Sequence, residues 1–262
     1  MTQQSLPHTR DSLGAQLRDL GVRPGSALLV HSSMRALGHV CGGTHAVAAA
    51  LLDALGPDGT LVVPTHTPDN SDPAGWSHPP VPEHWWPVIR AHTPGFDPTR
   101  TPSRWMGALP ELVRSWPGAS RSDHPQASFA ALGPDAERIV SGHALNEMLG
   151  ERSPLGRLYE LDGDVLLLGA GHGSNTSLHL AEYRQPDPPR ERLGAAVRTR
   201  SGREWVWWED VRVDEDDFGA LGADLDATGA VRTGPVGEAE ARLVRQRAAV
   251  DFAVGWLSSH RG

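Results

Sequence analysis

The stretch ALLVHSSMRALGHVCGGTHAVAAALLDALGPDGTLVVP, residues 27–64, decides the fold. Ala27–Val30 and Leu61–Val63 are short apolar runs of the kind that form buried strands. Between them, small and apolar residues recur at helical spacing over Ala46–Leu55, and Gly56 ends that pattern. A strand, a helix and a second strand in this order predict a parallel βαβ unit with a right-handed crossover.

The middle of the chain continues this alternation of strands and helices. Asp164–Leu168 is the clearest predicted strand, and a glycine turn and a helical pattern over Ser174–Tyr183 follow it. Ser128–Leu132 has the composition of a short strand, and a turn at Ser201-Gly202 indicates a hairpin within residues 195–208. These segments predict further strands beyond the first βαβ unit.

The remaining segments complete the predicted architecture. Helical spacing predicts helices over residues 11–20 and 236–258. Residues 66–104 are rich in Pro, His and Trp and have no sustained period, which indicates a long irregular insertion of functional importance. We therefore expect an α/β fold, with a single three-layer α/β/α domain over residues 1–262 around a central, mostly parallel or mixed sheet.

Composition excludes several classes of function. The net charge of −8 argues against a general nucleic-acid binder, and no apolar run is long enough for a membrane span. All 24 residues counted as Lys or Arg are arginines, so a lysine Schiff base or a P-loop lysine is excluded. HExxH, HxH and CxxC motifs are absent, and we expect no metal. A lone Cys41 and the lack of a signal-peptide pattern make the cytoplasm the expected compartment.

One candidate site lies in VLLLGAGHGSNTSLHLAEYR, residues 165–184, where a predicted strand runs into glycines and helix-capping residues. Ligands of α/β proteins bind beyond the carboxyl ends of the strands. His179 and Glu182 are three residues apart and share one face of the following helix. An imidazole beside a cleft can accept a proton near neutral pH. The residues alone leave open a second interpretation, a capped helix with a structural core histidine.

Two further groups of residues have the chemistry of ligand sites. The hydroxyls and backbone amides of HSSMRALG, residues 31–38, could hold a diphosphate together with Arg35, or form a plain turn. Asp69 and Asp72 lie in the insertion, and Glu209 follows a cluster of tryptophans. Carboxylates beside aromatic rings suit a polycationic, sugar-like ligand, although solvated turns would show the same pattern.

Five stretches together resemble the aminoglycoside 3-N-acetyltransferase family. They are LLVHSSMRALG at 28–38, LGPDGTLVVPTHTPDNSDP at 55–73, RSDHPQASFAALG at 121–133, SPLGRLYELDGDVLLLGAGHGSNTSLHLAEYR at 153–184, and GPVGEAEARL at 234–243. They occur in the order that the family shows and cover most of the chain. NTSLHLAE after VLLLG is the most specific of these matches.

The resemblance implies roles for individual residues. His179, the histidine of the N-T-x-x-H segment, would be the general base, and Glu209, in a motif like WWED, would orient it. The pantetheine and diphosphate of CoA would lie against Ser32, Ser33, Met34, Arg35 and Gly38, with Ser128 and Phe129 nearby. The acceptor side would be lined by Asp69, Asp72 and Glu182. A second histidine of many family members is missing from Gln126-Ala127-Ser128, and we interpret the nearby His124 as structural.

The function implied is direct acetyl transfer from acetyl-CoA to an amino group of an aminoglycoside antibiotic, at the 3-amino group of its 2-deoxystreptamine ring. The insertion at residues 66–104 would line the acceptor site. The expected partners are a small cationic amine, with no nucleic acid, no membrane and no metal, and the expected state is a monomer or homodimer. Three alternatives remain: the same fold and co-substrate acting on a biosynthetic amine, a non-catalytic protein that binds CoA or another small molecule, and a metal-dependent hydrolase.

Overall fold

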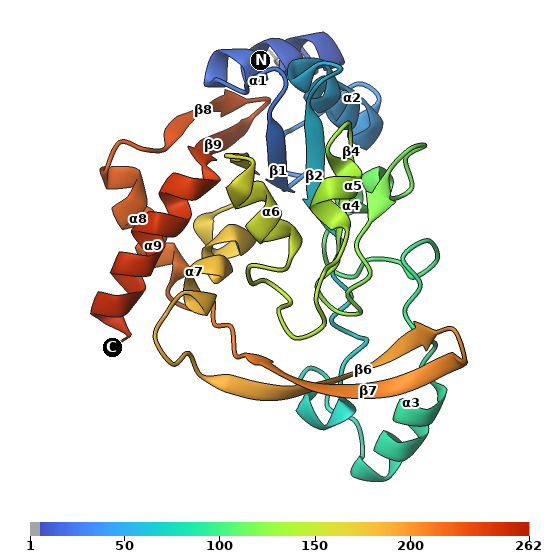
Figure 1. The fold of residues 1–262 in the computed structure, drawn as a ribbon. Helices are drawn as coiled ribbons and strands as arrows, with labels where there is room; N and C mark the ends of the chain where they lie inside the picture. The colour runs from blue at the N-terminus through green and yellow to red at the C-terminus, as the bar shows by residue number, and fades with distance from the viewer. Residues whose placement is uncertain (1–5, 262) are drawn as a thin grey trace.

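A mixed seven-stranded sheet forms the centre of the computed structural model, which describes residues 6–261 (Figure 1). β1 pairs in parallel with both β2 and β5, while β4 pairs antiparallel with β2 and β9 antiparallel with β5. The strands in spatial order are β3 (Ser120–Arg121), β4 (Phe129–Leu132), β2 (Thr60–Pro64), β1 (Ala27–Ser32), β5 (Asp164–Leu168), β9 (Ala239–Arg245) and β8 (Arg232–Val236). The expected central mixed sheet is therefore confirmed.

Helices cover both faces of this sheet, which gives three layers. One face packs against α1 (Arg10–Leu20), α2 (Gly43–Leu55) and α4 (Ala108–Arg114). The other face packs against α5 (Ala136–Val140), α6 (Pro154–Glu160), α7 (His179–Tyr183), α8 (Phe218–Ala227) and α9 (Gln246–His260). Two separate apolar clusters fill the two interfaces.

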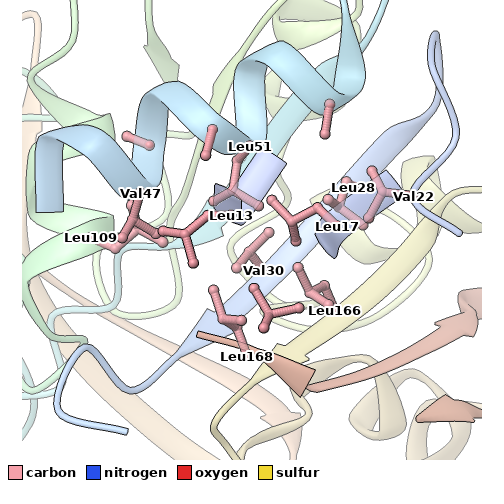
Figure 2. Packing of buried hydrophobic residues seen from close by; sticks show 14 of the residues in the cluster. Leu13, Leu17, Val22, Leu28, Val30, Val47, Leu51, Leu109, Leu166 and Leu168 are labelled. Carbon is pink, nitrogen blue, oxygen red and sulfur yellow. The ribbon is translucent and has the colours of Figure 1, made fainter. Parts of the chain in front are cut away.

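The alternation of side chains along each strand explains how one strand serves both interfaces. In β1, Leu28 and Val30 belong to the cluster under α1 and α2, whereas Leu29 points into the other cluster. Figure 2 shows the first interface, with Leu13 of α1 and Leu51 of α2 over the strands. A strand that is buried on both faces has to be apolar along its length, as the two predicted strands of the βαβ unit are. The structure confirms that β1 and β2 are buried and pair in parallel.

The predicted C-terminal helix over residues 236–258 is wrong in its first half. Residues 239–245, AEARLVR, form β9, and the helix begins only at Gln246. Ala239, Ala241 and Leu243 are buried while Glu240 is exposed, so the segment alternates with the period of a strand. Apolar residues and arginines recur through both segments, and this pattern also fits a single amphipathic helix.

The segment after β5 is also less regular than predicted. In place of a helix over Ser174–Tyr183, two short 3₁₀ turns, η3 (His172–Ser174) and η4 (Thr176–Leu178), precede the short helix α7. Asn175 Oδ1 accepts a hydrogen bond from the Ser177 amide and caps η4. These turns place His179 at the first position of α7.

The insertion packs against a long hairpin at the lower end of the molecule in Figure 1. The hairpin consists of β6 (Arg190–Thr199) and β7 (Gly202–Val211), which is longer than predicted. The insertion contains η1 (Pro73–Gly75), η2 (Glu83–Trp85) and α3 (Trp86–His92). Phe96 N donates to the carbonyl of Ala196 in β6 at 3.0 Å, which joins the two segments. Within residues 6–261, every helix is too short or too polar to cross a bilayer.

Candidate active site

A cavity of about 610 Å³ opens at the carboxyl ends of the parallel strands. His31 and Ser32 reach it from the end of β1, and His66 reaches it from the segment after β2. His179 lines it from the first turn of α7, after β5. Its other lining residues include Pro68, Ser71, Trp105, Met106, Gln126, Ala127, Met148, Leu149, Ser174, Thr176, Val213 and Glu215. The site lies where α/β folds bind ligands, because helix and loop connections diverge there.

A buried imidazole–carboxylate pair lies at this cavity. Nδ1 of His179 is 2.7 Å from Oε2 of Glu182, one helical turn further along α7. The side chains of His179 and Glu182 are 10% and 5% exposed. The ring of His179 also packs against Phe218, with ring centroids 4.8 Å apart. Because Glu182 engages Nδ1, Nε2 is the ring nitrogen left for a ligand in the cavity.

The other oxygen of Glu182 is held as well. Oε1 accepts a hydrogen bond from the backbone amide of Asp214 at 3.0 Å and another from Nη1 of Arg261 at 2.5 Å. A buried carboxylate requires such partners to offset the loss of hydration. The arrangement fixes Glu182 with one oxygen toward His179, so the imidazole has a defined orientation.

Two further histidines near the pair are neutral. Burial first, and the proximity of His179 second, lower the pKa of His31 to about 3. Burial also lowers the pKa of His66 to about 3, with smaller contributions from His31 and His179. Nε2 of His31 lies 3.3 Å from the hydroxyl of Thr176. The cavity therefore combines neutral rings with a single carboxylate-linked imidazole, an arrangement suited to proton transfer.

Comparisons with known proteins agree with this geometry. The sequence profile of the family described as aminoglycoside 3-N-acetyltransferase matches residues 29–258. The chain belongs to the aminoglycoside 3-N-acetyltransferase family. This membership makes the protein an acyltransferase.

Individual family members match along almost their whole length. The SPbeta prophage-derived aminoglycoside N(3')-acetyltransferase-like protein YokD of Bacillus subtilis (strain 168) is 41% identical over 254 residues, covering 97% of this chain and 93% of that protein. Aminoglycoside N(3)-acetyltransferase III of Pseudomonas aeruginosa is 37% identical over 278 residues, covering 100% of this chain and 98% of that protein.

Solved structures show the same fold. The crystal structure of YokD from Bacillus subtilis matches with a TM-score of 0.96 at 40% identity, covering 98% of this chain and 96% of that chain. A binary structure of AAC-IIIb with CoASH has a TM-score of 0.86 at 35% identity, with 97% of each chain covered. Sisomicin-bound AAC-VIa has a TM-score of 0.87 at 32% identity, covering 97% of this chain and 99% of that chain.

The predicted pairing of His179 with Glu209 is wrong. Glu209 is an exposed residue of β7, opposite Arg192 of β6, and it does not line the cavity. The neighbouring Asp210 points inward instead, where its carboxylate accepts hydrogen bonds from the Met148 amide and the Tyr183 hydroxyl. Consecutive residues of a strand point to opposite faces, so Glu209 faces solvent because Asp210 points inward.

The three carboxylates expected on the acceptor side do not line the cavity either. Asp69 is exposed and lies 3.7 Å from Arg104. Asp72 is paired with Arg90. Glu182 is buried and its oxygens are already occupied, as described above. The insertion itself does reach the cavity, through Pro68, Ser71 and other side chains.

The residues expected to bind CoA lie in different surroundings: one lines the cavity, several belong to the loop after β1, and two are buried in the core. Ser32 lines the cavity. In the loop that follows, Arg35 is exposed, Ser33 N donates to the carbonyl of Leu168, and Met34 packs against the core. Gly38 has a φ of +73°, and a Cβ there would lie 2.4 Å from the Glu238 carboxyl carbon, so a larger residue would strain the backbone and displace the Glu238 side chain.

Ser128 and Phe129, expected near CoA, have fully buried side chains. The Ser128 hydroxyl accepts from Nε of Arg121 and donates to the carbonyl of Thr65. Phe129 belongs to the core under α5. Neither side chain lines the cavity, so a place for them near CoA stays a prediction.

Four residues at or next to the cavity were missed: His31, His66, Glu215 and Arg261. His31 and His66 each follow a strand predicted to be buried, so the rule that ligands gather at carboxyl ends could have found both. Glu215 lies in the loop after β7 and Arg261 follows α9, and neither has a local sequence signal. Across residues 6–261, no three His, Cys, Asp or Glu side chains are grouped so as to bind a metal.

Proposed function

We propose that this protein transfers the acetyl group of acetyl-CoA to an amino group of an aminoglycoside, with His179 as the general base. The observation that supports this most is the His179–Glu182 pair at the cavity beyond β1, β2 and β5. A carboxylate on Nδ1 fixes the tautomer in which Nε2 is unprotonated and available.

The chemistry assigned to His179 is proton removal from the attacking nitrogen. An amine bound as ammonium must lose one proton before its lone pair can attack the thioester carbon, and it loses another as the amide forms. Nε2 of His179 accepts a proton directly or through water, while Glu182 stabilises the resulting imidazolium. A C–N bond forms, the C–S bond breaks, and the CoA thiolate takes up a proton.

Family members give independent support for both substrates. One solved relative carries CoASH, and another carries sisomicin. On the donor side we assign Ser32, at the cavity, and the exposed Arg35, whose charge suits a diphosphate. On the acceptor side we assign Glu215, the only carboxylate among the described residues that line the cavity. The 3-amino group of the deoxystreptamine ring is the proposed acceptor nitrogen.

The decisive experiment measures CoA release from acetyl-CoA in the presence of sisomicin, with Ellman's reagent as the thiol probe. Cys41 is exposed and is the chain's single cysteine, so Cys41→Ser provides a background without protein thiol. The position of the acetyl group is then assigned by NMR of the product. A parallel panel of simple diamines distinguishes a biosynthetic acceptor, and binding of acetyl-CoA without release would favour a non-catalytic protein.

The role of His179 is tested by His179→Ala. Removal of a positioned base lowers kcat by about 10²-fold or more, with the affinity for CoA retained. The matched control is His39→Ala, because His39 is an exposed histidine outside the cavity. Acetylation by His179→Ala at the rate of the control would remove His179 from the mechanism.

A further inference from the structure

The last described residue of the chain touches the carboxylate behind the proposed base. Arg261 follows α9, and its Nη1 lies 2.5 Å from Oε1 of Glu182. The two residues are 79 positions apart in sequence. The Arg261 side chain is 29% exposed, whereas that of Glu182 is 5% exposed. A partly hydrated guanidinium thus meets a buried carboxylate.

The guanidinium of Arg261 is itself fixed from three sides. Nε lies 2.7 Å from Oδ2 of Asp217, and Nη2 contacts Oδ1 of the same carboxylate. Nη2 also donates to the carbonyl of Asp214 at 2.5 Å. The guanidinium carbon lies 5.8 Å from the ring centroid of Phe218, the ring that also packs on His179. A planar group held by a bidentate carboxylate has a defined direction.

We propose that Arg261 is a positioning residue for the transfer reaction: it holds Glu182 in place and, through Glu182, sets the orientation and charge balance of His179. This inference rests on the proposed function. Glu182 has one oxygen on each partner, and the Asp214 amide also donates to Oε1, so without Arg261 the carboxylate keeps its contact with Nδ1 of His179 but its negative charge is no longer shared. Arg261 and Glu182 also line a second cavity, of about 530 Å³, which does not include His179.

The sign of the charge effect follows from Coulomb's law. With Arg261 present, part of the negative charge on Glu182 is neutralised. Without it, the carboxylate stabilises the imidazolium of His179 more strongly, and the base becomes protonated at higher pH. The titratable and charged groups around His179 are Glu182 on α7, His31 at β1, His66 after β2, Asp214 and Glu215 after β7, Asp217 before α8, and Arg261 after α9.

The test compares Arg261→Lys, which keeps the charge, with Arg261→Gln, which keeps a hydrogen-bond donor without the charge. We expect Arg261→Gln to lower kcat by about tenfold, the usual scale for a residue supporting a catalytic group, with the KM for acetyl-CoA within about twofold. The acid limb of its kcat/KM profile should move up by about 0.5–1 pH unit. Arg261→Lys should restore the acid limb and most of kcat.

A purely structural role for Arg261 predicts a different result. Arg247→Met is the matched control, because Arg247 is an exposed arginine in the first turn of α9 whose side chain donates only to the Tyr159 carbonyl. Thermal melts normalise all rates to folded protein. An unmoved acid limb in Arg261→Gln, equal behaviour of Arg261→Gln and Arg261→Lys, or the same shift in Arg247→Met would overturn the proposal.

A readout without turnover separates this inference from the proposed function. Two-dimensional ¹H–¹⁵N NMR follows the tautomer and titration of the His179 ring in each variant, with His179→Ala providing the assignment. An inactive wild-type enzyme would defeat the proposed function, while the NMR titration would still show whether Arg261 acts on the ring. If Arg261→Gln leaves that titration unchanged, the positioning role is wrong even in an active enzyme.

Discussion

Oε2 of Glu182 lies 2.7 Å from Nδ1 of His179, and both side chains come from a single turn of α7. The pair therefore forms locally, and the rest of the fold only has to bury it and fix its outer oxygen. Glu209, on the exposed face of β7, has no part in this arrangement. We therefore expect opposite effects on turnover when each of the two glutamates is changed to glutamine.

Glu182→Gln should lower kcat by roughly 10²-fold, because an amide can present its NH₂ to Nδ1 and stabilise the wrong tautomer. The KM for acetyl-CoA should change little. Glu209→Gln, the matched control, should keep wild-type turnover. Steady-state kinetics, with a thermal melt of each variant, make this comparison. Equal losses in the two variants would contradict the assignment of Glu182.

The pair was partly visible in the sequence, because residues at i and i+3 share a helical face. The resemblance to a family motif pointed to Glu209 instead, and strand alternation then decided which of two adjacent acids faces inward. The βαβ unit was predictable because a strand buried on both faces must be apolar throughout. The contact between Glu182 and Arg261 was not predictable, since it depends on how α9 packs after the chain has folded.

His124 is locked in a neutral tautomer, which fits the structural role expected for it. Nδ1 accepts hydrogen bonds from the amides of Gln126 and Ala127, and Nε2 faces the carbonyl of Leu145 at 3.1 Å. Burial lowers its pKa to about 4. The unfolded chain, with a histidine pKa of about 6.5, binds the proton more readily. The free energy of unfolding is therefore highest above pH 6.5 and falls as the pH drops toward 4.

We expect the titration of His124 to lower the free energy of unfolding at pH 5 by on the order of 2 kcal/mol. His124→Asn keeps an acceptor for the two amides and removes the titration, so its stability should depend less steeply on pH. Chemical denaturation at pH 7.5 and pH 5 measures the difference. His39→Asn, at an exposed histidine, should retain the wild-type slope. An unchanged slope in His124→Asn would show that protonation of His124 does not drive the acid loss.

Arg121 ties the insertion to the sheet through a half-buried guanidinium. Nε lies 3.0 Å from both the Thr65 and Ser128 hydroxyls, and Nη2 donates to the carbonyl of Thr65 at 2.7 Å. Nη1 contacts the carbonyls of Pro98 and Thr101 in the insertion. Desolvation lowers the pKa of Arg121 to about 10, so the guanidinium remains charged at neutral pH.

Arg121→Met should destabilise the protein by about 2–4 kcal/mol, because several buried acceptors lose a charged donor together. Arg121→Lys should recover only part of this loss, since an ammonium cannot reach both segments at once. Urea denaturation gives the free energies. Arg138→Met, which removes an exposed ion pair between Arg138 of α5 and Asp135 just before that helix, is the control and should change stability by less than about 1 kcal/mol. Similar values for the Arg121 and Arg138 variants would exclude the tethering role.

Substitutions of Glu215 and Asp69 test whether a polycationic acceptor binds beside the loop after β7 or beside the insertion. Glu215 lines the cavity, whereas Asp69 was expected there and is instead exposed beside Arg104. Glu215→Gln should raise the KM for sisomicin about threefold at low salt, the scale of a solvent-exposed charge pair, and the effect should shrink as ionic strength rises. Asp69→Asn should leave that KM unchanged. The reverse ranking of the two variants would place the acceptor against the insertion rather than against the loop after β7.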